Sequence, residues 1–257
     1  MAVITKYKPG EFCWSDLGTT DVAGAKKFYR GIFGCTFKDF PMAGTDETYS
    51  MLRVGGKDIA AIFPMPADMR KAKVKPSWNP FISVKSASGT AKKVKAAGGK
   101  VIVRPTKVMD AGHAAKVQDP SGATFGLWQP GKHKGAGVED KPGTVKWHDL
   151  NTFNTKAAGK FYAKVFGWKI EEKDFSGNKY YLFLLDGEDV CGMWPEPSKT
   201  LGSSWLTHWQ VANCAKTVAK VKRLGGRIIL GATPIPGMGH FAIVTDPKGA
   251  AFGLIGK

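Results

Sequence analysis

The chain has 257 residues, of which 43% are hydrophobic and 23% are charged, a composition typical of a globular protein with a sizeable core. No stretch is apolar and long enough to cross a bilayer, and the first residues lack the apolar block of a secretory signal. We therefore expect a cytoplasmic protein with no membrane partner. The four cysteines form no CxxC pair, which favours inert thiols over disulfides or a zinc site.

The formal net charge of +17 raises nucleic acid as a partner. The excess is nearly all lysine, is spread along the chain, and is densest at residues 70–75, inside a connector. No RNA-binding or zinc-finger pattern accompanies it. We therefore interpret the charge as a solvated basic surface and expect no nucleic-acid partner.

The first part of the chain alternates strand and helix signals. Asp21 stands at the cap position of a helix with one apolar face, and Gly55-Gly56 is typical of a hairpin turn. The predicted elements are, in order, a strand at 12–17, a helix at 21–31, and strands at 35–40, 49–54 and 59–63.

The same order of elements then starts again. Gly98-Gly99 is a helix stop signal, and Asp119-Pro-Ser-Gly122 predicts a type I turn between two strands. The second set is predicted as a strand at 78–84, a helix at 86–97, and strands at 100–103, 114–118 and 124–128.

The whole arrangement occurs twice, because the chain is an internal duplication. Residues 14–34 recur as 147–167 with an offset of 133, and residues 98–127 recur as 225–254 with an offset of 127. A unit of one strand, one helix and three strands therefore occurs four times.

These units predict an α+β fold of two tandem domains. We place the first at residues 1–130 and the second at 144–257, joined by a Gly-, Pro- and charge-rich linker at 131–143. In each domain a pair of βαβββ units is expected to form a curved half-barrel sheet with its helices outside.

With these motifs the chain resembles the vicinal oxygen chelate superfamily, which includes glyoxalase I, extradiol dioxygenases and bleomycin-resistance proteins. More narrowly, it is similar to tandem glyoxalase-like proteins, and the resemblance covers essentially the whole chain. It is carried by the following motifs: Phe28-Tyr29 and Phe161-Tyr162, Phe33-Gly34 and Phe166-Gly167, and the closing stretches 119–127 and 246–254.

The resemblance implies a divalent metal held by His, Gln or Glu on the first and last strands of a unit. The corresponding positions of this chain are Trp14, Trp147, Gly126 and Gly253, with Asn79 and Leu206 on the first strands of the second and fourth units. Trp, Gly and Leu side chains offer no lone pair that binds a metal. We therefore expect no metal and no other cofactor.

Strand alternation places every second residue on the concave face of each sheet. On this basis the cavity positions are Phe12, Trp14, Asp16, Asn79, Phe81 and Ser83 in the first copy, and Trp147, Asp149, Asn151, Leu206, His208 and Gln210 in the second. Gly126 and Gly253 leave space for a ligand or for a close approach of the backbone. We therefore expect aromatic-walled sites for a small molecule. The predicted ligand-binding residues are Trp14, Asp16, Asn79, Phe81, Gly126, Trp147, Asn151, Gln210 and Gly253.

His208 and Asp149 are the candidate catalytic residues. Alternation places no other histidine inside a cavity, and it places Asp149 on the neighbouring half-sheet, where a carboxylate can orient an imidazole for proton abstraction. His148 is expected to face the helices. The alternatives are structural: His208 could be a hydrogen-bonded core residue, the two tryptophans could fill the space of the metal, and the aspartates could bond backbone donors.

Three functions follow from this interpretation. The first is a tandem protein, monomeric or homodimeric, that binds a small organic molecule without metal, as an enzyme or as a sequestering protein. The second is a metal-dependent lyase or dioxygenase-like enzyme with non-standard ligands, such as His208 and Asp149. The third is an interaction protein that uses its basic surface.

Overall fold

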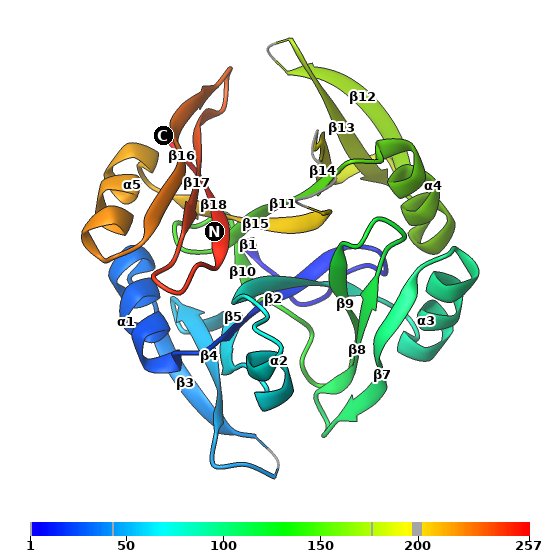
Figure 1. The fold of residues 1–257 in the computed structure, drawn as a ribbon, viewed down its shortest axis with the longest axis horizontal. Helices are drawn as coiled ribbons and strands as arrows, with labels where there is room; N and C mark the ends of the chain where they lie inside the picture. The colour runs from blue at the N-terminus through cyan, green and yellow to red at the C-terminus, as the bar shows by residue number, and fades with distance from the viewer. Residues whose placement is uncertain (1, 43, 176, 197–201) are drawn as a thin grey trace.

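The computed structural model describes residues 2–42, 44–175, 177–196 and 202–257. These residues form two eight-stranded sheets, one from each half of the chain, and a short two-stranded sheet. Four of the helices cover the outer faces of the two large sheets, in two adjacent pairs (Figure 1). The tandem α+β fold predicted from the repeats is confirmed.

The N-terminal half contains two of the four units. Its elements are β1 (Ala2–Val3), β2 (Phe12–Thr19), α1 (Val22–Phe33), β3 (Thr36–Pro41), β4 (Thr48–Val54), β5 (Lys57–Pro64), α2 (Ala67–Lys71), β6 (Ser77–Ser83), α3 (Ala87–Ala96), β7 (Lys100–Val108), β8 (Gly112–Gln118) and β9 (Thr124–Pro130). The short helix α2, inside the basic connector, was not predicted.

The C-terminal half repeats the order after the linker. The linker itself contains β10 (Val138–Glu139), and the elements that follow it are β11 (Val145–Thr152), α4 (Thr155–Phe166), β12 (Lys169–Phe175), β13 (Asn178–Leu185), β14 (Glu188–Pro195), β15 (Ser204–Val211), α5 (Cys214–Arg223), β16 (Arg227–Ile235), β17 (Gly239–Thr245) and β18 (Ala251–Gly256). The strand orders of the two sheets are β3-β4-β5-β2-β6-β9-β8-β7 and β12-β13-β14-β11-β15-β18-β17-β16.

Each large sheet is made of two units joined at their first strands. β2 pairs antiparallel with β6, and β11 pairs antiparallel with β15. Within each unit the first strand lies parallel to the last strand, so the helix between them crosses over the outer face. The joined first strands therefore run through the middle of each sheet, where they carry the candidate site residues.

Side-chain caps begin the four long helices, as the sequence indicated for the first of them. Asp21 accepts a hydrogen bond from the backbone N–H of Gly24, and Ser86, Asn154 and Asn213 make the equivalent bonds in the other units. The residue after α1 is Gly34, with φ of 66°, a left-handed conformation that glycine adopts easily.

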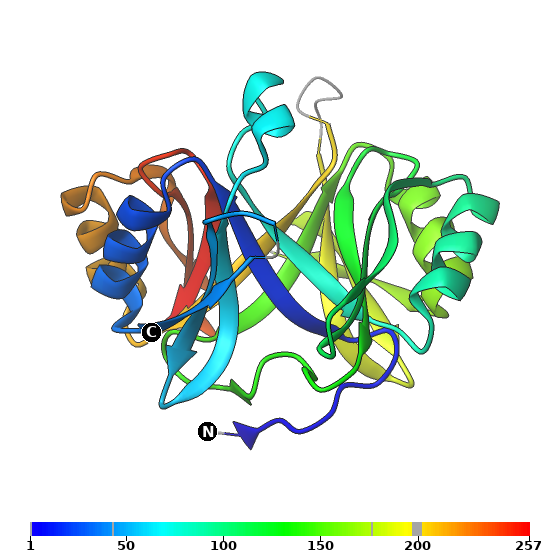
Figure 2. The same cartoon turned by 90° about the horizontal axis from the view of Figure 1, so that it is seen from below.

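The apolar cores do not follow the division into two sheets. One cluster joins α1 and its strands to residues of α5, β15, β17 and β18, and a second joins α3 and its strands to residues of α4, β11, β13 and β14. Figure 2 shows the same pairing, with α1 beside α5 and α3 beside α4. Each core is therefore built mainly from one unit of each half, with Trp78 of β6 added to the first cluster and Trp205 of β15 added to the second.

The two repeated motifs of the sequence meet across these shared cores. The hydroxyl of Tyr29 donates to Oδ2 of Asp246 at 3.3 Å, and the hydroxyl of Tyr162 donates to Oδ2 of Asp119 at 3.1 Å. The other oxygen of Asp119 accepts the backbone N–H of residues 121 and 123 and holds the turn. The helix motif of one copy therefore anchors the closing turn of the other.

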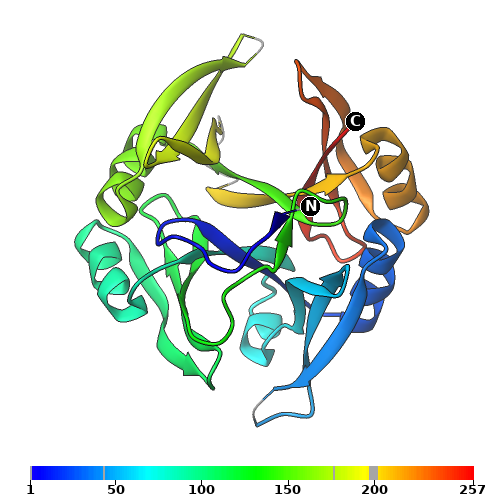
Figure 3. The same cartoon turned by 180° about the vertical axis from the view of Figure 1, so that it is seen from behind.

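The predicted linker lies along the protein rather than apart from it (Figure 3). Its backbone bonds Cys13 and Asp58 of the N-terminal half, and β10 pairs with β1 near the N-terminus. Tyr7 also donates to the carbonyl of Ala136. The domain limits at 130 and 144 stay a proposal. Within the described part of the chain, no helix is long and apolar enough to cross a bilayer.

Candidate functional site

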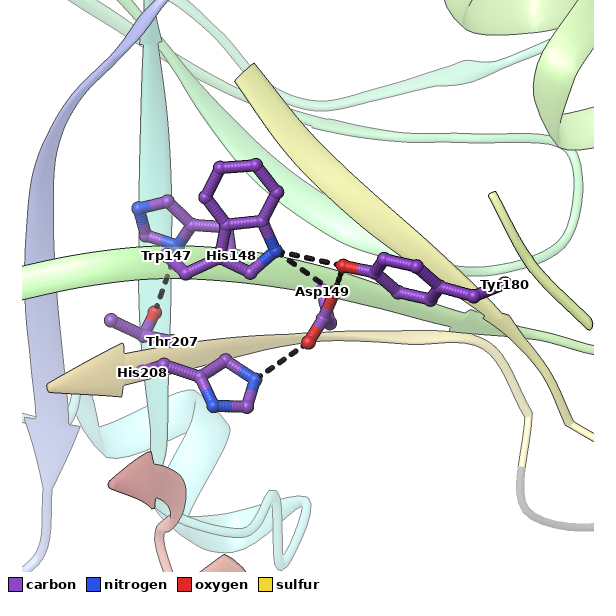
Figure 4. Close-up of polar contacts among 6 residues, drawn as sticks. All are labelled: Trp147, His148, Asp149, Tyr180, Thr207 and His208. Atoms are coloured by element: carbon purple, nitrogen blue, oxygen red, sulfur yellow. Dashed lines mark hydrogen bonds and ion pairs between the residues drawn. The ribbon is translucent and has the colours of Figure 1, made fainter. Parts of the chain in front are cut away.

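The middle strands of the C-terminal sheet bring Asp149 and His208 together on the concave face. Asp149 lies on β11 and His208 on β15, and both are buried, with 6% and 3% of their surface exposed. Nε2 of His208 lies 2.9 Å from Oδ2 of Asp149 (Figure 4). The two atoms are close enough for an ion pair when the imidazole is protonated, and the contact lacks the alignment of a hydrogen bond. Nδ1 of His208 has no hydrogen-bond partner among the described residues.

The second oxygen of Asp149 is held by two aromatic side chains. The hydroxyl of Tyr180 donates to Oδ1 at 2.8 Å, and Nε1 of Trp147 lies 3.2 Å from the same oxygen and 2.9 Å from the tyrosine oxygen (Figure 4). Burial, followed by the charge of Asp149, raises the pKa of Tyr180 well above its ordinary value, so the hydroxyl stays protonated. Asp149 is therefore fixed with one oxygen toward His208.

Two glycines make room for this group. A Cβ at Gly253 would lie 1.9 Å from Nδ1 of His208, and a Cβ at Gly192 would lie 1.7 Å from the hydroxyl of Tyr180. No other residue type fits at either position without displacing these side chains. Gly253 was predicted to leave space for a ligand, and the imidazole of His208 fills that space.

An aromatic wall stands beside Asp149. It consists of Phe175, Tyr180 and Trp194, all half-buried, with ring centroids 4.5 Å apart for Tyr180 and Trp194 and 5.5 Å apart for Phe175 and Trp194. Asn151 pairs in register with Trp194 and is half-buried. The wall offers ring faces for stacking next to a polar centre. None of its three residues was predicted, because they come from strands whose facing was not assigned.

Gln210 lies on the same strand as His208, one alternation step further along. Its backbone bonds Gly143 at the end of the linker and Thr144, the next residue, and its side-chain oxygen is buried without a hydrogen-bond partner among the described residues. Gln210 therefore stands at the linker end of the face, away from the aromatic wall.

The N-terminal sheet carries a related group on its concave face. Asp16 accepts hydrogen bonds from the hydroxyl of Tyr49 at 3.4 Å and from Nδ2 of Asn79 at 3.2 Å, and Nε1 of Trp14 donates to the Tyr49 oxygen at 3.0 Å. Burial raises the pKa of Asp16 to about 7, against the lowering effect of Asn79, Lys116 and Tyr49. The nearest cation is Lys116, whose Nζ donates to Oδ1 of Asn79 at 3.0 Å.

Phe81 takes the place of His208 in this sheet. A Cβ at Gly126 would lie 2.0 Å from Cδ1 of Phe81, so Gly126 clears the ring as Gly253 clears the imidazole. Tyr49 also stacks on Phe63, with centroids 6.1 Å apart, which forms a smaller counterpart of the C-terminal wall. Tyr49 and Lys116 were missed from the sequence.

The placement of Phe12 in the cavity was wrong. The register of β2 shifts between Phe12 and Trp14, and this bulge turns Phe12 to the outer side. There its ring stacks on His148, with centroids 4.2 Å apart, and contacts Trp168 and Trp205. His148 faces the outer side as predicted, and burial followed by the charge of His208 lowers its pKa to about 3.

The Glyoxalase/Bleomycin resistance protein/Dioxygenase superfamily matches residues 13–127 and again residues 141–254. The chain belongs to this superfamily. Two relatives are similar over nearly the whole chain. One is CFP32 of Mycobacterium tuberculosis, which is named as a glyoxylase, and the other is the anthracycline biosynthesis protein DnrV of Streptomyces peucetius. CFP32 is 34% identical over 98% of this chain and 96% of its own length, and DnrV is 30% identical over 98% and 95%.

Solved structures of the superfamily share the fold. The Mn(II)-bound glyoxalase of Novosphingobium aromaticivorans aligns with a TM-score of 0.66 and 14% identity, over 97% of this chain and 82% of its own. The 2,3-dioxygenase LapB of Pseudomonas sp. KL28 aligns with a TM-score of 0.63 and 13% identity, over 100% and 94%. At these identities the likeness concerns the fold alone.

The divalent metal that the resemblance implies does not fit the residues of this chain. The positions that resemblance assigns to ligands carry tryptophan, glycine and leucine, apart from Asn79, whose amide is engaged with Asp16 and Lys116. Among the described residues no group of three or more His, Cys, Asp or Glu could hold a metal ion. His208 and Asp149 alone would be two ligands, which is fewer than zinc or iron sites use.

A cavity of about 420 Å³ lies between the two halves rather than over either concave face. Its walls include Trp14 and Trp147, the N-terminal segment and the linker. Lysines and carboxylates are mixed along it, at Lys6, Lys8, Lys146, Glu11, Glu139, Glu188 and Asp189. This mixed charge selects no ligand class, so the cavity does not define a site by itself.

Proposed function

We propose that this protein binds a planar aromatic molecule on the concave face of its C-terminal sheet and removes a proton from it without a metal. The observation that carries the proposal is the contact of His208 with Asp149, which holds a buried imidazole whose Nδ1 has no partner among the described residues, with the aromatic wall on the far side of Asp149. In this proposal His208 is the base and Asp149 positions it.

The chemistry follows from the two nitrogens of the imidazole. With its proton on Nε2, next to the carboxylate of Asp149, a neutral imidazole presents the lone pair of Nδ1. A planar substrate that reaches the buried Nδ1 would give it a C–H proton, and the C–H electron pair would pass into the conjugated system of the substrate, whose far end would stack on Tyr180 and Trp194. The carboxylate then stabilises the imidazolium that forms, as in other base sites.

The relatives support an organic substrate. DnrV and a protein of Streptomyces sp. are named for anthracycline biosynthesis, and anthracyclines are polycyclic aromatic compounds. A molecule of that shape suits a wall of three half-buried rings. CFP32 is named for glyoxylase chemistry, which is compatible with proton abstraction next to a carbonyl group.

The test uses 5-nitrobenzisoxazole, a planar bicyclic compound whose ring opens to a coloured phenolate when a base removes its C–H proton. We expect the wild-type protein to open it about 100-fold faster than His208→Gln, a usual contribution of a positioned base. The matched control is His240→Gln, at a half-buried histidine on β17. Trp194→Ala should raise KM while His208→Gln lowers kcat. Equal rates for wild type and His208→Gln would contradict the base role.

The same samples separate the two alternatives. Saturable binding of the probe with no ring opening would favour a sequestering protein over an enzyme. About one metal ion per chain by elemental analysis, lost in His208→Gln, would favour the metal-dependent alternative. A metal-free wild-type protein that keeps its full rate would contradict that alternative.

A further inference from the structure

The concave face of the N-terminal sheet contains a cation without a direct counter-ion. Lys116 lies on β8 and is half-buried, and within the described part of the chain it pairs with no carboxylate closer than 4.0 Å. Its hydrogen bond goes to Oδ1 of Asn79, a neutral acceptor. An ammonium group has three donors, so most of its capacity is left for another partner.

The nearby carboxylate does not serve as that partner. Asp16 is turned toward the hydroxyl of Tyr49 and Nδ2 of Asn79, and the amide of Asn79 stands between the carboxylate and Lys116. A partly desolvated cation favours an anionic oxygen over a neutral one. An anion that reaches Nζ of Lys116 would therefore complete the group.

The surroundings of Lys116 indicate what should be attached to the anion. In register, β8 places Lys116 opposite Gly126, and β6 places Phe81 beside the same glycine. Half-buried Phe81, Tyr49 and Phe63 therefore offer ring faces on the side of the sheet where the ammonium ends. An aromatic ring with one carboxylate matches both features.

This group is specific to the N-terminal half. The repeat offset of 127 places Ile243 at the position of Lys116 and Leu206 at that of Asn79. The C-terminal face therefore has neither the ammonium nor the amide. We propose that the N-terminal concave face is a separate site for an aromatic carboxylate, with Lys116 as the charge partner of the carboxylate and Phe81 beside its ring.

The proposal includes a dependence on pH. The groups that face Asp16 are Tyr49 from β4, Asn79 from β6 and Lys116 from β8, and burial raises the pKa of Asp16 to about 7. Below that pH the carboxyl is neutral and the site has the full charge of Lys116. Above it, Asp16 is charged and repels an incoming carboxylate. The affinity should therefore fall as the pH rises from about 6 to about 8.

The experiment measures binding of 4-fluorobenzoate to the full chain by fluorine NMR, with the neutral 4-fluorobenzamide as the comparison probe. We expect saturable binding of the carboxylate, a loss of at least about tenfold in Lys116→Met, and a change of no more than a few-fold in Lys116→Arg. The matched control for the basic surface is Lys107→Met, an exposed lysine on β7, which should leave the affinity unchanged.

The outcomes distinguish this inference from the proposed function. His208→Gln should leave 4-fluorobenzoate binding unchanged; if it abolishes binding, the anion lies on the other face and the inference is overturned. Equal affinity for the amide, no saturable binding, or equal losses in Lys116→Met and Lys107→Met would also overturn it. If Lys116→Met does not fold, the pH dependence decides: it should be present in the wild type and absent in Asp16→Asn, and its absence from the wild type would overturn the inference.

Discussion

The two concave faces have the same polar frame and different reactive groups. Each frame consists of a tryptophan, a tyrosine and an aspartate: Trp14, Tyr49 and Asp16 in the N-terminal sheet, and Trp147, Tyr180 and Asp149 in the C-terminal sheet. The group that completes the frame is an amide with a lysine in the first and an imidazole in the second. A duplicated frame can therefore keep a buried carboxylate in place while the chemistry next to it changes.

The faces also differ in how far they are filled. At the linker end of the N-terminal face, the ring of His133 contacts Trp14 and Trp128, with centroids 4.5 and 5.6 Å apart. The position of Trp128 is taken by the smaller, half-buried Ile255 in the C-terminal copy. The larger aromatic wall, with Phe175 and Trp194, is on the C-terminal face. These differences favour the C-terminal face for a large planar ligand.

The largest effect is expected when the two halves of the chain are separated. A chain of residues 1–131 keeps its whole sheet but loses the α4 and α5 sides of both apolar cores. We expect it to fold, because each sheet is complete, and to self-associate through the exposed apolar surface. Circular dichroism and analytical ultracentrifugation test this. A random-coil spectrum, or a folded monomer, would contradict the expectation.

Replacing the buried carboxyl of Asp16 by an amide tests how its charge affects stability. The pKa of Asp16 is raised by burial from 3.8 to about 7, so the folded protein binds more protons than the unfolded chain between these values. Stability therefore falls as the pH rises through that window. The free energy of unfolding of Asp16→Asn should exceed that of the wild type by up to about 4 kcal/mol near pH 8. The two proteins should differ little near pH 4. Denaturant unfolding at the two pH values measures this, and a difference independent of pH would contradict it.

The smallest effect is expected from the two glycines that clear the reactive groups. Gly253→Ala and Gly126→Ala introduce a Cβ about 2 Å from His208 and Phe81, and each should cost roughly 1–3 kcal/mol of unfolding free energy. Removing the opposing ring in Gly253→Ala/His208→Ala and Gly126→Ala/Phe81→Ala should recover part of the loss. Double-mutant cycles by thermal unfolding check the coupling. If the losses of stability in the single variants add up in the double variant, the glycine and the opposing ring do not interact, and the expectation is wrong.

The sequence predicted the fold because the repeat supplies the topology. Once the unit of one strand, one helix and three strands was seen four times, the strand pairings were limited to few arrangements. Alternation on the first strands was also enough to bring His208 to Asp149, since both residues lie beyond the bulges in their sheet. Phe12 failed because it precedes the bulge in β2, and one extra residue reverses the face.

The sequence did not predict the side chains that contact the two aspartates from the outer strands. The register of those strands depends on pairings with distant parts of the chain. Tyr180 and Trp194 belong to β13 and β14, and Lys116 to β8, where no motif fixed the facing. The docking of the linker against Cys13 and Asp58 was also missed, because composition indicates a loop but not what its backbone bonds. Alternation in β13, counted back from the buried Phe183, would have placed Tyr180 on the inner face.

The reciprocal bonds of Tyr29 to Asp246 and of Tyr162 to Asp119 bear on how this duplication has evolved. The tyrosine of each copy holds a turn in the other copy. A substitution of either tyrosine or either aspartate would therefore destabilise a turn in the opposite half or leave its anchor unpaired. Among the described residues, the side chains of Asp16, Asn79, Lys116, Asp149 and His208 bond only partners of their own half, so these positions can diverge independently. This explains, from inside a single chain, why the helix and turn motifs persist in both copies while Lys116 and His208 each occur in only one.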